Sequence, residues 1–288
     1  MNVRNIVIGL IGSALVAGVL VSCGGGSGGG DTPAAAAAAA VRSATLNQAQ
    51  ETPAPPVAST AVGRGAVVVN PTTKAITGGI TFTGLTGNPS GAHIHRGNTS
   101  IAIALVIAAD NATATVPPNT TIADADYAEL LAGTLYFNVH TASNPDGEIR
   151  GNITGTTGVT AGLASVSSAE ETTGSTSTAT GRGTIVFDST TGEILIVYLT
   201  HDVTNVTAAH IHTGAPGVQG PANVVSLTQG TNIFTGPVTT PRAALTSQQM
   251  TDFNAGNTYF NIHSTNLLCP PPAGSCSAGE IRGQIAVQ

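Results

Sequence analysis

The sequence predicts an all-β protein built from two tandem antiparallel β-sandwich domains with Greek-key connections, each with at most one short helix. Short β-branched runs such as GAVVVN, TIVFD and EILIVYLT alternate with Asn-Pro, Thr-Gly and Gly-x-Pro turns, which is the pattern of short sandwich strands. In addition, several long blocks occur twice in the same order, which indicates a duplicated domain.

The duplication divides the chain into two copies. TAVGRGAVVVNPTTKAITGGITFTGL at 60–85 corresponds to TATGRGTIVFDSTTGEILIVYLTHDV at 178–203. GAHIH, AGTLYFNVH and GEIRGNI recur as AAHIH, AGNTYFNIH and GEIRGQI, at offsets of 117, 123 and 132 residues. Each copy is long enough to close a core of its own. We therefore place domain 1 at 43–156 and domain 2 at 160–288, and we expect the length differences to lie in loops.

Each copy also contains one stretch that favours a helix. DADYAELLAG at 124–133 and LTSQQMTDFNAG at 245–256 both end in glycine, the usual residue after the C-terminus of a helix. We expect one short helix in each domain at these positions.

The N-terminus has the features of an export signal. Arg4 supplies a positive charge, and an apolar run follows that ends in LVSC at Cys23, a sequence that resembles the bacterial lipobox. We assign residues 1–22 to a lipoprotein signal peptide, and 23–42 to a lipidated Cys23 with a flexible Gly/Ala tether. An uncleaved transmembrane anchor is the alternative, but an apolar run of about 16 residues is short for a span. By resemblance to Gram-negative sorting rules, Gly24 after the cysteine indicates the outer membrane, on its periplasmic or surface side.

Composition excludes several classes of function. Only 8% of the residues are charged, the formal net charge is -6, and the nine basic residues are scattered along the chain. A nucleic-acid partner needs a basic stripe, which this chain does not offer. The sequence also lacks a nucleophile elbow, a phosphate loop and an HExxH motif, so we expect a binding protein rather than an enzyme.

Two further cysteines, Cys269 and Cys276, flank the segment PPPAGS. In an oxidising compartment such a pair is expected to form a disulfide that closes a small loop. Thiolate ligation of a metal is the alternative, although the pair lacks a CxxC spacing.

Four separated motifs are shared by both copies in the same order: AHIHxG, a strand around VVSL or ALV, YFNVH or YFNIH, and GEIRGNI or GEIRGQI. In this respect the chain resembles the CHRD domain, which was first described in chordin and is widespread in bacterial secreted proteins. The second copy has HTGAPGVQGPANVVSL, similar to the family pattern HxGxxGxxGPVVxxL, whereas HRGNTSIAIALV in the first copy is shorter and lacks the Gly-Pro stretch. The resemblance implies a tandem pair of β-sandwich domains, with the better site in domain 2.

Strand alternation places six of the seven histidines on one repeated face. In AHIH and YFNVH the small or apolar residues face the core, so the histidines share the opposite face. Positions two apart on a strand are about 6.6 Å apart, and imidazoles at that spacing can converge on one ion with bonds of about 2.0–2.1 Å. Three imidazoles without thiolates suit copper first and zinc second. The predicted ligands are His93, His95 and His140 in domain 1, and His210, His212 and His263 in domain 2.

Polar residues on the same face complete the predicted site, and Glu148 or Glu280 could orient an imidazole through its second nitrogen. The predicted supporting residues are Asn138, Glu148, Arg150, Asn261, Glu280 and Arg282. Cu/Zn superoxide dismutase is another β-sandwich with His-x-His on one strand, so dismutase-like redox chemistry remains an option by analogy.

An alternative interpretation needs no metal. The same side chains can form cross-strand hydrogen bonds and ion pairs, such as Glu148 with Arg150 and Glu280 with Arg282. The chain would then be a cell-surface module, held to the membrane by its N-terminal lipid, that binds another protein or a polysaccharide. His201 lies outside the repeated set, and we expect it in a surface turn. Imidazoles that converge at a point would favour a metal, and splayed imidazoles bonded to glutamate or asparagine would not.

Overall fold

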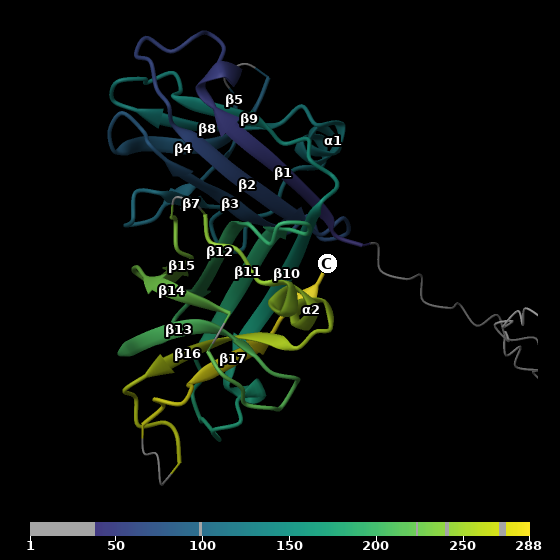
Figure 1. The fold of residues 1–288 in the computed structure, drawn as a ribbon, viewed down its shortest axis with the longest axis vertical. Helices are drawn as coiled ribbons and strands as arrows, with labels where there is room; N and C mark the ends of the chain where they lie inside the picture. The colour runs from purple at the N-terminus through teal and green to yellow at the C-terminus, as the bar shows by residue number, and fades with distance from the viewer. Residues whose placement is uncertain (1–37, 98–99, 223, 240–241, 271–274) are drawn as a thin grey trace, which may run out of the picture. The chain divides into compact units, whose positions relative to one another are not determined.

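The computed structural model describes residues 38–97, 100–222, 224–239, 242–270 and 275–288. Each repeat forms a nine-stranded antiparallel sheet with one short α-helix, which confirms the predicted fold class (Figure 1). The predicted signal peptide and lipidated Cys23 lie outside the described residues. Within the described ranges, no helix is long and apolar enough to cross a membrane.

The two repeats have nearly the same order of elements. The first consists of β1 (Ala40–Asn47), η1 (Gln48–Gln50), β2 (Val62–Val69), β3 (Ile76–Thr83), β4 (Pro89–Arg96), β5 (Ser100–Ala104), β6 (Val106–Ile107), β7 (Thr113–Thr115), α1 (Asp124–Ala132), β8 (Tyr136–Thr141) and β9 (Ile149–Asn152). The second consists of β10 (Val159–Ser167), η2 (Ser168–Glu170), β11 (Thr180–Asp188), β12 (Ile194–His201), β13 (Val206–Thr213), β14 (Val225–Gln229), β15 (Ile233–Thr235), α2 (Ser247–Asn254), β16 (Thr258–Ser264), β17 (Ile281–Gln284) and β18 (Ala286–Val287).

Both sheets curl around their cores. In the second repeat, β10 pairs with β17 on one side and with β11 on the other, so the sheet closes on itself. In the first repeat the strand order is β5-β4-β8-β9-β1-β2-β3-β7-β6. Its two end strands, β5 and β6, are separated in the chain by the single residue Leu105, so this sheet is also nearly closed. Opposite walls of each sheet therefore face one another across one core.

The cores contain the apolar residues that alternate with the histidines. In the first repeat, Ile94 and Phe137 are fully buried against Ile80 and Phe82 from the opposite wall. Ile211 and Phe260 occupy the same positions in the second repeat. Because neighbouring residues of a strand point to opposite faces, this burial fixes the histidines on the outer side of the same strands.

Each helix lies where the sequence predicts it. Helix α1 ends at Gly133, whose φ of 73° is the left-handed conformation that glycine adopts easily. Helix α2 begins with a capping box, in which Thr246 and Gln249 each bond the other's backbone N–H. Phe253 of α2 packs edge-on against Phe187 in the core of the second repeat, with ring centroids 4.9 Å apart.

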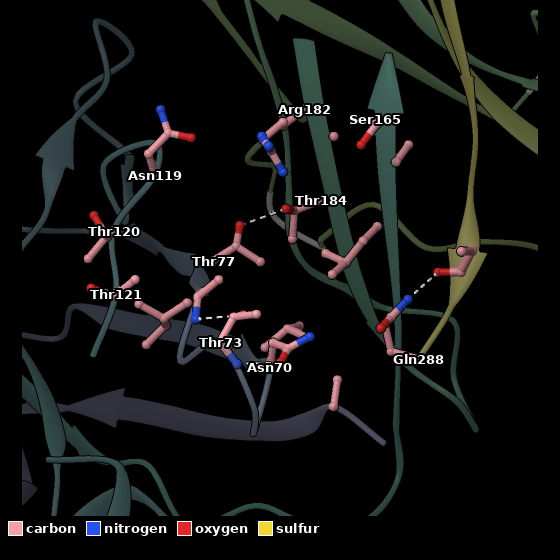
Figure 2. Close-up of a pocket in the computed structure, with 18 of the residues that line it drawn as sticks. Asn70, Thr73, Thr77, Asn119, Thr120, Thr121, Ser165, Arg182, Thr184 and Gln288 are labelled. Carbon is pink, nitrogen blue, oxygen red and sulfur yellow. Dashed lines mark hydrogen bonds between the residues drawn. The ribbon is translucent and has the colours of Figure 1, made fainter. Parts of the chain in front are cut away.

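A third apolar cluster combines side chains of both repeats, from strands β2, β10, β11 and β12; its buried members are Ala66, Val68, Ala161, Val186, Leu195, Ile196 and Tyr198. Beside it lies a pocket of about 650 Å³, lined in part by Asn70, Thr77, Arg182 and Thr184 (Figure 2). The hydroxyls of Thr77 and Thr184 are 2.8 Å apart in a hydrogen bond. The lining of this pocket contains no histidine, so it is separate from the site described next.

Candidate metal centre

In the first repeat, three adjacent strands arrange the predicted residues in rows. Strand β8 pairs with β4 on one side and β9 on the other. The register places His93 opposite Asn138, and Asn138 opposite Arg150. One row further along β4, His95 is opposite Tyr136. Directly opposite residues on antiparallel strands point to the same face, so these side chains lie together.

The second repeat reproduces this arrangement on β13, β16 and β17. His210 is opposite Asn261, which in turn is opposite Arg282. His212 is opposite Tyr259. The third histidine of each repeat lies on the middle strand, two residues after the asparagine and on the same face. His140 is opposite Gly91, and His263 is opposite Ala208.

In each repeat the three imidazoles converge. We define the first triad as His93, His95 and His140, and the second triad as His210, His212 and His263. In either triad, one ring nitrogen from each residue lies within 4.8 Å of the other two. The centre of a triangle with sides of 4.8 Å lies about 2.8 Å from its corners, so inward shifts of under 1 Å give the metal–nitrogen distance of about 2.0–2.1 Å.

Backbone carbonyls orient the rings. In the second triad, His212 Nδ1 lies 2.9 Å from the carbonyl oxygen of Gly220, and His263 Nδ1 lies 3.1 Å from that of Ser277. A carbonyl oxygen can only accept, so each Nδ1 carries the proton and each Nε2 keeps its lone pair. His212 Nε2, His263 Nε2 and His210 Nδ1 are all buried without a hydrogen-bond partner.

These unpartnered nitrogens show whether the site suits a metal ion. A buried polar atom without a partner costs about 1–3 kcal/mol, so three in one place require an explanation. A cation that accepts all three lone pairs would remove this cost. Neutral imidazoles are also the form in which histidine binds a metal.

The first triad is arranged differently. His140 Nδ1 lies 3.0 Å from the carbonyl oxygen of Pro145, so its Nε2 is again the lone-pair nitrogen. That Nε2 is 3.1 Å from His93 Nδ1, a distance at which His93 donates a hydrogen bond to it. Two members of the first triad are thus bonded to each other.

Electrostatics keep these histidines neutral. Burial is the main cause that lowers the pKa of His93, His140, His210 and His212 below 6.5. Burial also lowers the pKa of His263 to about 4, and the neighbouring imidazoles of the second triad add to the effect. Desolvation disfavours the charged imidazolium, so lone pairs are available at neutral pH.

A tyrosine and an arginine stack beside each triad. The ring of His212 is stacked on Tyr259, with centroids 4.9 Å apart, and the guanidinium of Arg282 lies 3.5 Å from the centre of the same tyrosine ring. His95 and Tyr136 form the equivalent stack in the first repeat, with centroids 5.2 Å apart. The guanidinium of Arg150 lies 3.5 Å from the centre of the Tyr136 ring, so both predicted supporting arginines contact the tyrosine of their site.

Each repeat also contains a glutamate that sequence reasoning missed, buried in the first repeat and half-buried in the second. Glu51 follows η1, and one of its oxygens accepts from Asn138 Nδ2 at 3.5 Å. Glu171 follows η2 and bonds Asn261 in the same way. Burial raises the pKa of both carboxyls to about 7. Gly147 lies against the first pair, because a Cβ there would be 2.7 Å from Glu51 Oε1.

The structure corrects the expected roles of Glu148 and Glu280. Glu148 accepts hydrogen bonds from the hydroxyls of Ser59, Thr86 and Thr141, at 2.6–2.7 Å. Glu280 bonds Ser177, Ser264 and Asn266. These bonds tie each carboxylate to loops and strand ends, so the glutamates orient no imidazole. Neither Glu148–Arg150 nor Glu280–Arg282 is among the ion pairs that the described residues form.

Three further expectations can be compared with the structure. The outward face is covered rather than open, since His95 and His212 are each only 6% exposed. The expected surface position of His201 is wrong: it is buried at the end of β12, with its ring 5.1 Å from that of Phe234. Cys269 and Cys276 form a disulfide, with Cα atoms 5.2 Å apart, as predicted.

Comparison with known proteins agrees with this duplicated site. The family model of the CHRD domain matches residues 42–153 and again residues 163–285, and each match contains one triad. No curated protein and no solved structure matches the chain. The two family matches cover most of the sequence, and the protein therefore belongs to the CHRD-domain family, as two tandem domains.

Proposed function

We propose that each CHRD domain binds one transition-metal ion through its histidine triad, copper first and zinc second. The protein would store, deliver or sequester the metal at the cell envelope, as a binding protein rather than an enzyme. The single observation that carries this proposal is the second triad, where one ring nitrogen of each histidine lies within 4.8 Å of the other two and each histidine has a buried ring nitrogen without a hydrogen-bond partner.

The chemistry of the donors supports copper or zinc. Imidazole nitrogen suits both metals, whereas calcium and magnesium require mostly oxygen. A bound ion with three protein ligands would keep one position open for water or a small ligand. The carbonyls of Pro145, Gly220 and Ser277 fix which ring nitrogen is available, as second-sphere partners do in metal sites.

Metal titration tests this function. The purified protein is titrated with Cu(I), Cu(II) and Zn(II), beside a His93→Ala/His95→Ala variant, a His210→Ala/His212→Ala variant and the variant that combines all four changes. We expect two ions per chain for the wild type, one for each double variant and none for the combination. His201→Ala is the matched control, because His201 is buried but outside both triads. A stoichiometry that the triad variants leave unchanged would refute the proposal.

We propose that the chain is exported and anchored by a lipid on Cys23, with the outer membrane as its destination. The LVSC sequence before a flexible tether supports this placement. Cys23→Ala should release the protein from the membrane fraction and abolish incorporation of a labelled fatty acid. Retention of the label in the variant would contradict lipidation at this residue.

The alternative is a surface module that binds a protein or a polysaccharide, with structural histidines. It predicts that the quadruple triad variant still binds its partner and that the wild type takes up no metal. Dismutase-like chemistry is a separate option, and it requires a superoxide dismutation rate from the copper-loaded protein that the triad variants lose.

A further inference from the structure

The two triads differ in one covering loop. In the second repeat, residues 214–221 follow β13 and contact His212, Tyr259 and Arg282; we call them the covering loop. In the first repeat, the chain leaves β4 at Arg96 and enters β5 already at Ser100. The covering loop is therefore a feature of the second repeat.

Arg282 anchors this loop through two hydrogen bonds. Its Nη1 donates to the carbonyl oxygen of Val218 and its Nη2 to that of Ala215, both at 2.9 Å. Gln284, two residues further along β17, donates to the carbonyl oxygen of Gly214 at 3.0 Å. Arg282 is only 1% exposed, so these charge-assisted bonds are shielded from water.

The loop in turn fixes the ring of one ligand. The carbonyl oxygen of Gly220 accepts the hydrogen bond from His212 Nδ1, and the backbone N–H of Gly220 donates to the hydroxyl of Tyr259 at 3.0 Å. Only glycine fits there, because a Cβ would lie 1.7 Å from the carbonyl oxygen of Thr213. A connected chain of contacts thus runs from Arg282 through the loop to Tyr259 and His212, and it fixes the orientation of the His212 ring.

The first repeat uses its matching arginine differently. Arg150 donates to the hydroxyl of Thr52 at 3.0 Å instead of holding a loop. The hydrogen bond from His93 to His140 must break before both nitrogens can bind a metal. In the second triad, the corresponding nitrogens of His210 and His263 have no partner to lose.

From these contacts we infer that the two sites have unequal affinities: the second triad is preorganised and loads first, and Arg282 is the positioning residue that holds it ready. This inference rests on the proposed function of metal binding. It makes the protein a two-step metal binder, with a tight site in the second repeat and a weaker site in the first. A hydrogen bond that must break is worth about one factor of ten in affinity, so we expect a difference of about tenfold.

Single-site variants measure the difference. Zn(II) is titrated by competition with a chromophoric chelator into the His93→Ala/His95→Ala variant, which keeps the second triad, and into the His210→Ala/His212→Ala variant, which keeps the first. We expect the second triad to bind Zn(II) about tenfold more tightly. Absence of binding in the wild type as well would refute the proposed function together with the inference. Equal affinities, or a tighter first triad, would overturn the inference and leave the function standing.

The role of Arg282 is tested in the variant that keeps the second triad. Arg282→Gln should weaken Zn(II) binding about tenfold, and Tyr259→Phe, which keeps the ring stack and is the milder change, about threefold. Arg182→Gln, an exposed arginine of the same repeat, is the matched control and should change nothing. The melting temperature of the metal-free protein is measured in parallel, and it reports whether Arg282→Gln still folds. If Tyr259→Phe and a folded Arg282→Gln both bind Zn(II) as tightly as their parent, the positioning role is refuted.

Discussion

Replacing Glu51 by glutamine should change how the stability of the protein depends on pH. Glu51 is 7% exposed and accepts one weak hydrogen bond, from Asn138. Its second oxygen and the amide oxygen of Asn138 are both buried without a donor. Two facing acceptors of this kind favour a protonated carboxyl. Glutamine has nearly the same shape and cannot ionise, so Glu51→Gln isolates the proton.

The magnitude follows from the pKa. Burial raises the pKa of Glu51 from 4.5 to about 7, although Arg150 and Asn138 lower it in part. The folded state therefore holds more protons than the unfolded state between these pH values, and stability falls as pH rises through them. The interval corresponds to about 3 kcal/mol at 1.36 kcal/mol per pH unit. Below pH 4.5 both states are protonated, and this contribution is fully present.

Urea unfolding of the metal-free protein at pH 4.5, 6 and 8 measures the effect. We expect the free energy of unfolding of Glu51→Gln, relative to wild type, to rise by up to about 3 kcal/mol between pH 4.5 and 8. The triad histidines are common to both proteins, so their own titration cancels in the difference. Glu129→Gln, at a half-buried position of α1, is the matched control for the Glu-to-Gln change itself. A relative stability that stays constant with pH would show that the carboxyl of Glu51 has the same pKa in the folded and unfolded states, and would refute the effect of its burial.

Three further predictions concern the second repeat. Gly279→Ala should lower the free energy of unfolding by about 2 kcal/mol or more, because at φ 145° its Cβ would lie 2.6 Å from Glu171 Oε1. Gly217→Ala is the control: Gly217 also has a positive φ but no atom near the added Cβ, so urea unfolding should show a loss of only about 1 kcal/mol. The Zn(II) affinity of the second triad should fall by less than about 100-fold from pH 7.5 to pH 5.5. Burial brings the pKa of His263 to about 4, so this histidine stays neutral in that range, and burial lowers the pKa of His210 and His212 below 6.5. Three histidines with a pKa of 6.5 would lose about 1000-fold to protons, and a loss of that size would contradict their burial. Removing the disulfide with Cys269→Ala/Cys276→Ala should lower the free energy of unfolding in urea by about 2 kcal/mol. It should also weaken Zn(II) binding, because the carbonyl of the adjacent Ser277 orients His263. Unchanged Zn(II) binding would show that the loop keeps its place without the disulfide.

The sequence was sufficient for the fold and for the shared face of the triad histidines, because both depend on local periodicity. Alternation along AHIH and YFNVH fixes which residues face the core, and Ile94 and Phe137 are indeed buried there. The internal repeat then shows that the same face occurs twice. The pairing of β4 with β8, which brings His140 to His93, needed the structure, because strand order is not encoded in alternation.

The surroundings of the site could not be predicted in the same way. Glu51 reaches Asn138 across 87 residues of sequence, from a 3-10 turn with no periodic pattern. The offset of 120 between the Glu-Thr pairs at 51–52 and 171–172 was the available signal, and it lies just outside the conspicuous repeat blocks. Glu148 was misassigned because alternation gives a face but not a partner. Its partners, Ser59 and Thr86, come from loops that the pattern does not describe.

The two repeats share the residues that form the site and differ in a loop beside it. Both repeats keep the same histidines, asparagine, tyrosine and arginine in the same rows of three strands. The loop after β4 or β13 differs, and with it the partner of the arginine: Thr52 in one repeat and the covering loop in the other. A loop that already holds a histidine ring in place removes the cost of ordering that ring when a metal binds. A change of the loop therefore alters the metal affinity although the histidines stay the same. A duplicated domain can therefore acquire two different metal affinities through a loop alone, and the strands that hold the ligands need not change.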